Sequence, residues 1–200
     1  MSKTICILSF SGSSRVDSLN GKLLSVATQG ARTAGAVVTE IDLMNYPMPI
    51  YNGDLEATEG QPESATALKS LMRDSHGFLI SSPEYNGGYS PLLKNAIDWV
   101  SRPVPGEPRL AAFTDKTAAI MSASPGRLGG IRGLGQLRQI LGNIGVLVLP
   151  DQVTLPAAQN AFKRDGTIAD RDTHEEVARL GHQLANILKK VWSWCQLPKN

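Results

Sequence analysis

Two short stretches of this 200-residue chain have the residue types and the spacing of ligand-binding loops. The first, residues 11–20 (SGSSRVDSLN), joins a β-branched apolar run to a helical pattern. Its small hydroxyl side chains, its glycine and the free N–H groups of a helix start suit a bound phosphate, and Arg15 would add a forked cationic donor. Serine and asparagine also cap helices very often, so this stretch could instead have a purely structural role.

The second stretch, residues 83–88 (PEYNGG), lies between an apolar run over residues 76–80 and a helical pattern over residues 92–102. The apolar residues of that helix fall on one face, which indicates packing against a sheet. The loop before the helix therefore lies at the carboxyl end of a strand, where open α/β sheets bind ligands. Because glycines let a flat ligand approach the backbone closely, Gly87 and Gly88 favour a planar ligand here.

Neither stretch contains a nucleotide-binding fingerprint of the common kinds. The GxxxxGK[ST] pattern of P-loop hydrolases is missing, and so is the GxGxxG pattern of dinucleotide-binding folds. No Ser-His-Asp order or Cys-His pair is evident, and neither the three histidines nor Cys6 and Cys195 have metal-ligand spacing. From the residues we therefore expect no nucleophilic triad or dyad of these kinds, no metal ion, and two reduced structural thiols.

The rest of the chain alternates between strand-like and helix-like patterns. Strand patterns occur over residues 4–10, 36–43, 76–80, 117–123 and 145–149, and Pro150 should end the last of them. This alternation predicts an α/β fold, a single domain over residues 1–200 with a five-stranded parallel sheet and helices on both faces. We interpret it as a flavodoxin-like three-layer α/β/α sandwich of strand order 2-1-3-4-5, in which the loops after strands one and three meet at the switch point.

Three further segments give expectations that the structure can test. Residues 124–130 (SPGRLGG) form a third loop between a strand and a helix. The run that begins at Thr173 and includes His174 reads as a capping box for the last helix, with His174 and His182 on a solvated helix face. Residues 45–62 fit neither a helix nor a purely solvated loop. Their apolar side chains could pack on the core or form a subunit contact beside the ligand site, and both alternatives stay open.

Composition excludes several classes of function. A formal net charge of +2, without a block of like charge, does not indicate a basic surface for binding nucleic acid. No apolar run approaches the length that crosses a bilayer, and the N-terminus has no signal-peptide pattern. We therefore expect no nucleic-acid partner, no membrane association and a cytoplasmic location.

Three motifs together resemble a known family: Gly12-Ser13-x-Arg15-x-x-Ser18-x-Asn20, Pro83-Glu84-Tyr85-Asn86-Gly87 and Lys94-Asn95-Ala96-Ile97-Asp98-Trp99. Over most of residues 4–150 the chain resembles the NADPH-dependent FMN reductase family, particularly its quinone and chromate reductase branch. The resemblance implies three groups of FMN-binding residues. The phosphate would be held by Ser13, Arg15, Ser18 and Asn20, with Leu19 also contacting the cofactor; the ring by Pro83, Glu84, Tyr85, Asn86 and Gly87; and Ser124 and Gly126 would border the flavin from a third side.

The same resemblance implies an enzyme whose chemistry is carried by FMN rather than FAD, since only one phosphate cradle is evident. NADPH or NADH would give a hydride to the flavin and leave, and a small electron acceptor would then take two electrons at the same face. That acceptor could be a quinone, chromate, an azo compound or free flavin. Tyr85 could donate a proton or only pack against the ring. The resemblance also implies a homodimer or homotetramer.

The alternative is a flavodoxin-type FMN electron carrier without NAD(P)H chemistry of its own. Carriers of that type are usually strongly acidic, because they dock their partners electrostatically. This chain is slightly basic. Its charge therefore favours the reductase over the carrier.

Overall fold

The computed structural model describes residues 4–194, with side chains described through residue 191, so Cys195 lies outside the described residues. Five strands form one sheet in the order β2-β1-β3-β6-β7, and every neighbouring pair is parallel. Counted along the chain within this sheet, the order is 2-1-3-4-5, as the sequence predicts. The strands are β1 (Cys6–Ser11), β2 (Val37–Asp42), β3 (Gly77–Ser81), β6 (Thr117–Ala123) and β7 (Leu147–Leu155).

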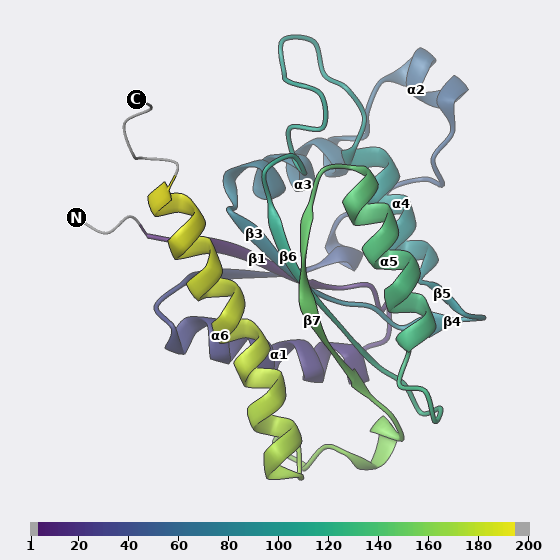
Figure 1. Ribbon diagram of the computed structural model, residues 1–200. Helices are drawn as coiled ribbons and strands as arrows, with labels where there is room; N and C mark the ends of the chain where they lie inside the picture. The colour runs from purple at the N-terminus through teal and green to yellow at the C-terminus, as the bar shows by residue number, and fades with distance from the viewer. Residues whose placement is uncertain (1–3, 195–200) are drawn as a thin grey trace.

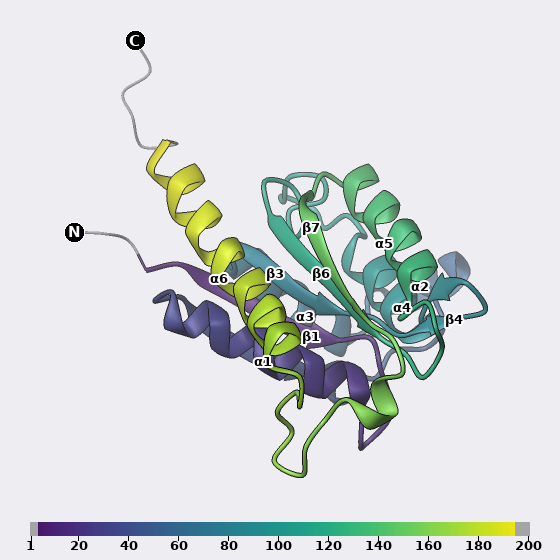
Figure 2. The same ribbon diagram turned by 60° about the horizontal axis from the view of Figure 1, so that its bottom comes forward.

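Helices cover both faces of the sheet, which confirms the three-layer sandwich (Figures 1 and 2). One face carries α1 (Leu19–Thr33) and α6 (Arg171–Trp194), and the other carries α3 (Glu63–Asp74), α4 (Pro91–Val100) and α5 (Ile131–Asn143). The central strands β3 and β6 are buried along their whole length, as expected for parallel strands covered on both sides. A separate apolar core therefore lies on each side of the sheet.

Helices α1 and α6 cross very closely. A Cβ atom added at Gly30 would lie 1.9 Å from the carbonyl oxygen of Ala178, and one added at Gly181 would lie 1.8 Å from that of Ala27. Only glycine allows the two backbones to approach this far. The crossing holds α1 against α6. The predicted phosphate loop, which leads into α1, is thereby held in place as well.

Strand β7 differs from its prediction, because it continues through Pro150 to Leu155. Ala118 pairs with Val148, but Ile120 pairs with Gln152, so three residues of β7 oppose one residue of β6. Pro150 lies in this irregularity on an edge strand, where the missing N–H breaks no regular ladder bond. The expectation that Pro150 ends the strand was therefore wrong.

The last helix also begins earlier than the proposed capping box. It starts at Arg171, and the carboxylate of Asp170 accepts hydrogen bonds from the N–H and the hydroxyl of Thr173 at 2.8 and 2.6 Å. Asp170, not Thr173, is the capping side chain. His182 is exposed as expected, whereas His174 is half-buried.

The segment over residues 45–62 contains a helix that its sequence pattern did not predict. The 3₁₀ turn η1 (Leu43–Asn45) is followed by α2 (Gly53–Glu59), whose N-terminus is capped by Asn52. Tyr46 and Met48 pack on the core, which confirms the packing interpretation for these two side chains. Ile50 remains 87% exposed.

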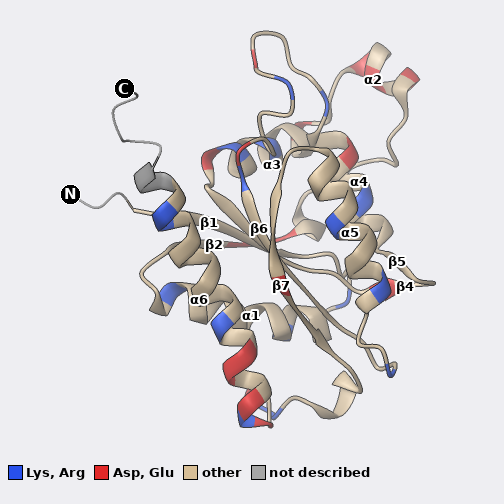
Figure 3. Ribbon diagram, in the orientation of Figure 1, with Lys and Arg blue, Asp and Glu red and all other residues tan. Residues whose placement is uncertain are grey.

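Charged residues of both signs are spread over the elements in Figure 3. Acidic side chains gather at the start of α6, at Asp172, Glu175 and Glu176, where they complement the positive end of the helix dipole. Within residues 4–194, no helix is long and apolar enough to cross a membrane. Nor do the described residues include a group of three or more His, Cys, Asp or Glu that could hold a metal ion.

Candidate functional site

The carboxyl ends of β1, β3 and β6 lie side by side, and the three predicted loops leave the sheet from these ends. A hollow of about 70 Å³ opens between the loops. Of the residues that line it, all but Ala123 and Pro125 are among those predicted from the sequence. The lining consists of Ser13, Arg15, Leu19, Asn20, Pro83, Glu84, Tyr85, Ala123, Ser124 and Pro125.

Four predicted residues lie outside this lining. Ser18 is the N-cap of α1 and accepts a hydrogen bond from the N–H of Gly21 at 3.0 Å. Asn86 and Gly87 form the tip of a hairpin, and Gly126 is exposed on the third loop. For Ser18, the structural role that the sequence left open is the one that its side chain performs here.

The first loop has the groups that a phosphate needs. Arg15 is exposed, and its guanidinium has no hydrogen-bond or ion-pair partner among the described residues. Beside it, the first N–H groups of α1, from Leu19 and Asn20, have no acceptor within the helix. The nearby Asp17 is paired with Lys22 at 2.6 Å, and this bond and charge lower the pKa of Asp17. Its negative charge is therefore compensated and opposes a bound anion only weakly.

Asn20 has a different role from Arg15, although both belong to one motif. The side chain is buried, and its amide nitrogen donates to the carbonyl of Ala123 at 2.8 Å. Its amide oxygen accepts from the Ser81 hydroxyl at 2.9 Å and from the Ala123 N–H at 3.0 Å. Asn20 thus joins the start of α1 to the carboxyl ends of β3 and β6, and holds the first loop against the other two.

The second loop is a β-hairpin of β4 (Glu84–Tyr85) and β5 (Gly88–Tyr89), outside the main sheet. Asn86 and Gly87 both have positive φ, 53° and 85°, which is the signature of a type I′ turn. Asn-Gly is the strongest short hairpin signal in a sequence, so this hairpin could have been predicted from Asn86-Gly87. Gly88 has an ordinary φ, and positive φ is required only at Asn86 and Gly87.

Glu84 and Tyr85 are neighbours in this hairpin but have unlike surroundings. The Glu84 carboxylate bonds to Arg132 at 2.6 and 2.9 Å and to the N–H of Gly133 at 3.0 Å. Burial alone would raise the pKa of Glu84, but the bonds from Gly133 and Arg132 outweigh it and lower that pKa. Tyr85 is 46% exposed and makes no side-chain hydrogen bond within the described part of the chain. Of the two, only Tyr85 has a polar group free to meet a ligand.

The third loop rests on the segment that follows β7. The N–H of Ser124 donates to the carbonyl of Leu155 at 3.0 Å, and the N–H of Ala158 donates to the carbonyl of Ser124 at 3.1 Å. The Ser124 hydroxyl accepts a bond from the N–H of Gly126 at 3.1 Å. Ser124 is thus held at the border of the hollow, while Gly126 shapes the loop.

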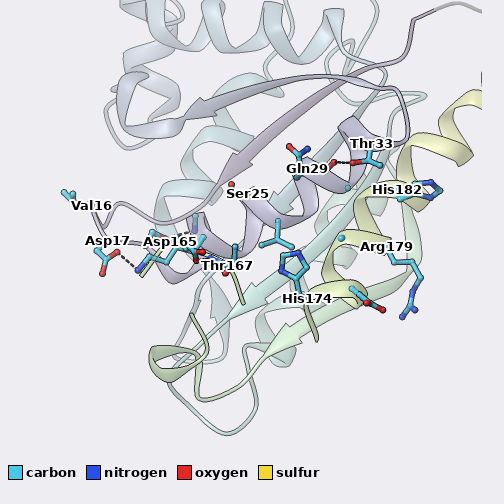
Figure 4. Close-up of a pocket in the computed structure, with 18 residues that line it drawn as sticks. Val16, Asp17, Ser25, Gln29, Thr33, Asp165, Thr167, His174, Arg179 and His182 are labelled. Carbon is cyan, nitrogen blue, oxygen red and sulfur yellow. Dashed lines mark hydrogen bonds and ion pairs between the residues drawn. The ribbon is translucent and has the colours of Figure 1, made fainter. Parts of the chain in front are cut away.

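A larger groove, of about 980 Å³, lies on the other side of α1, between this helix, the turn at residues 165–167 and α6 (Figure 4). His174 points into it, and its Nδ1 is buried without a hydrogen-bond partner among the described residues. Among the predicted ligand residues, only Ser18 lines this groove. The candidate site is therefore the smaller hollow, where the three loops meet.

Comparisons with known proteins agree with this geometry. A family model described as NADPH-dependent FMN reductase matches residues 5–160. The chain is 38% identical over 176 residues to an NAD(P)H-dependent FMN reductase of Pseudomonas aeruginosa, which covers 88% of this chain and 90% of the relative. It is 33% identical over 152 residues to a quinone reductase of Escherichia coli, covering 74% of this chain and 76% of the relative.

Among solved structures, the fold is similar to that of FerB, a flavoenzyme NAD(P)H:(acceptor) oxidoreductase from Paracoccus denitrificans. The TM-score is 0.76 at 29% sequence identity, and the match covers 94% of this chain and 98% of the other.

Proposed function

Because this chain belongs to the NADPH-dependent FMN reductase family, we propose that it binds FMN between its three loops and passes two electrons from NADPH or NADH to a quinone or a related acceptor. The observation that carries the proposal is the meeting of these loops at one hollow. One loop supplies an arginine with no side-chain partner among the described residues, beside the Leu19 and Asn20 N–H groups that have no acceptor within α1. Another supplies a hairpin with an exposed tyrosine.

Two groups of residues fit two parts of FMN, its phosphate and its ring. Arg15 and the first N–H groups of α1 would hold the phosphate, because they combine a forked cation with donors at a positive helix end. Residues 83–87 would contact the ring, with Ser124 at its border. In this proposal Ser18 and Asn20 shape the phosphate loop through the bonds they already make.

When bound, FMN supplies the chemistry by accepting a hydride and giving two electrons onward. The protein's contribution is to hold and orient it. The hollow is much smaller than the several hundred Å³ of an enclosing ligand pocket, so its residues can cover only part of a cofactor. Glu84 is bonded to Arg132 and Gly133, whereas the Tyr85 side chain makes no hydrogen bond within the described residues and lies exposed beside the proposed ring site.

The proposal extends to the acceptor, the assembly and the location. A partly covered cofactor selects acceptors weakly, so chromate, azo compounds and free flavin are included beside quinones. Met44 and Ile50, 52% and 87% exposed, follow the carboxyl end of β2, at the same edge of the sheet as the ligand loops. Such apolar exposure supports a homodimer or homotetramer with a contact beside the site. We place the protein in the cytoplasm, where cells keep reduced nicotinamide nucleotides.

Two measurements on the purified protein test this function. Cofactor released by heat should be FMN by chromatography, and the flavin absorbance should bleach on anaerobic addition of NADPH or NADH. Recovery of FAD, or no flavin bound after reconstitution with FMN, would end the proposal. Sedimentation at micromolar concentration should give a dimer or tetramer, and a fully active monomer would contradict the assembly.

A further inference from the structure

Helix α5 begins without a capping side chain of its own. Its N-cap residue is Gly130, with a φ of 93°, and no side chain in its own turn accepts a bond from the first N–H groups. A Cβ atom at residue 130 would lie 1.9 Å from the hydroxyl oxygen of Ser122, so a serine or aspartate cap cannot be placed there. The cap has to come from another part of the chain.

Glu84, in the β4–β5 hairpin 49 residues earlier in the sequence, supplies this cap. One carboxylate oxygen accepts the N–H of Gly133 at 3.0 Å, and the other accepts Nε and Nη2 of Arg132 at 2.9 and 2.6 Å. The Glu84 side chain is only 8% exposed, whereas that of Arg132 is 63% exposed. Charge-assisted bonds at a partly buried carboxylate are among the stronger contacts that a side chain makes.

The rest of the hairpin follows the same helix. The side-chain amide of Gln136 donates to the carbonyl of Gly87 at 3.1 Å. Gly133 has no side chain, and a Cβ atom there would lie 3.1 Å from the carbonyl oxygen of Gly88. The first turns of α5 thus contact the hairpin at Glu84, Gly87 and Gly88.

We propose that Glu84 is a positioning residue, whose carboxylate caps α5 and thereby sets the orientation of the hairpin that contacts the flavin ring. This inference rests on the proposed function, because it assigns the hairpin to FMN. Two strands of two residues are too short to hold an orientation by themselves. Their placement therefore depends on docking to α5, and Glu84 makes the charged contact of that docking.

The first test needs no flavin. In flavin-free protein, Glu84→Gln keeps the size of the side chain but removes its charge. Amide hydrogen exchange at residues 85–89 should become about 10-fold faster, because a charged hydrogen bond is replaced by a weaker neutral one. Exchange in β3 and β6 should not change. The matched control is Glu175→Gln, which breaks an exposed ion pair with Arg171 at 2.7 Å on α6 and should leave the hairpin as it was.

The second test is a double-mutant cycle on FMN affinity. Glu84→Gln and Arg132→Gln should each weaken binding, Glu84→Gln by about 10-fold, and the double variant should bind about as well as Glu84→Gln alone. If Glu84→Gln lowers only the thermal midpoint, with unchanged hairpin exchange and FMN affinity, Glu84 is a structural cap and the inference is wrong. Additive losses would also overturn it.

Failure of this inference is distinguishable from failure of the proposed function. If the unmodified protein binds no FMN, the function fails, whereas hairpin exchange in Glu84→Gln still reports on the docking. If the unmodified protein binds FMN and the variants match it in both exchange and affinity, only the role of Glu84 is refuted.

Discussion

At the scale of single residues, the candidate site separates side chains that are free to meet a ligand from side chains already bonded within the protein. Arg15 is exposed and unpaired in the described structure. Asn20 and Glu84 are buried or nearly so, and both terminal polar atoms of each side chain are hydrogen-bonded. A motif cannot make this separation, because it places residues of both kinds within a few positions. The contacts of each side chain decide its role.

Arg15→Ala should weaken FMN binding by about 10- to 150-fold, because a hydrogen bond to a charged group contributes roughly 1.5–3 kcal/mol. The fold should stay intact, since the guanidinium has no partner among the described residues. Titration of flavin-free protein with FMN measures the change. Arg109→Ala is the matched control, since Arg109 is exposed in the loop before β6, at the opposite edge of the sheet. Equal affinities for the two variants would place the phosphate elsewhere.

Asn20→Ala should behave differently and destabilise even the flavin-free protein. It leaves the N–H and carbonyl of Ala123 and the hydroxyl of Ser81 without their partner in a buried site. Each orphaned buried group costs about 1–3 kcal/mol, so a loss of more than about 2 kcal/mol in unfolding free energy is expected. Urea denaturation of the flavin-free variant gives this value. A stability equal to that of Arg15→Ala would mean that Asn20 acts on the ligand and not on the loops.

At the scale of elements, the sequence predicted what local patterns determine. Apolar runs that alternate with helical periodicity identified all five main strands and their parallel order, because crossover connections leave few arrangements for such a chain. Pro150 was misread because the tolerance of an edge strand for a bulge depends on its partner, β6. The capping of α5 by Glu84 could not be predicted from local patterns either, since it joins residues 49 positions apart. The hairpin, in contrast, had a local signal in Asn86-Gly87.

Gly87 and Gly88 allow a test of that hairpin with a matched pair. Gly87 has a φ of 85° and Gly88 an ordinary φ, so alanine is strained only at position 87. At position 88, the added Cβ would lie 3.3 Å from the end of the flexible Gln136 side chain, which can move. Since a left-handed residue costs about 1–2 kcal/mol, Gly87→Ala should weaken FMN binding roughly 5- to 30-fold.

Gly88→Ala should bind FMN nearly as the unmodified protein does. Both variants should keep the far-ultraviolet spectrum of an α/β protein. The reverse order of affinities would indicate that the space beside Gly88, not the turn at Gly87, limits the ligand.

At the scale of the whole molecule, three loops separated by about seventy and forty residues in sequence meet because parallel strands end at one edge of the sheet. That meeting point could be predicted from strand order alone. What the pattern could not predict is how little the loops enclose, since the hollow is only about 70 Å³ and Tyr85 is 46% exposed. The openness of the site bears directly on how substrates use it.

A reductase must leave one face of the flavin open, and because the nicotinamide and the acceptor both need that face, they should use it in turn. We therefore expect ping-pong kinetics, with parallel double-reciprocal lines when NADPH or NADH is varied at several concentrations of a quinone. In the Gly87→Ala variant, these rates should fall at subsaturating FMN and recover at high FMN, because the hairpin affects binding of the cofactor. Intersecting lines would mean that both substrates bind together and that the proposed ring position has room for both. Bound FMN with negligible NADPH or NADH oxidation would instead identify an electron carrier that depends on another protein for its reduction.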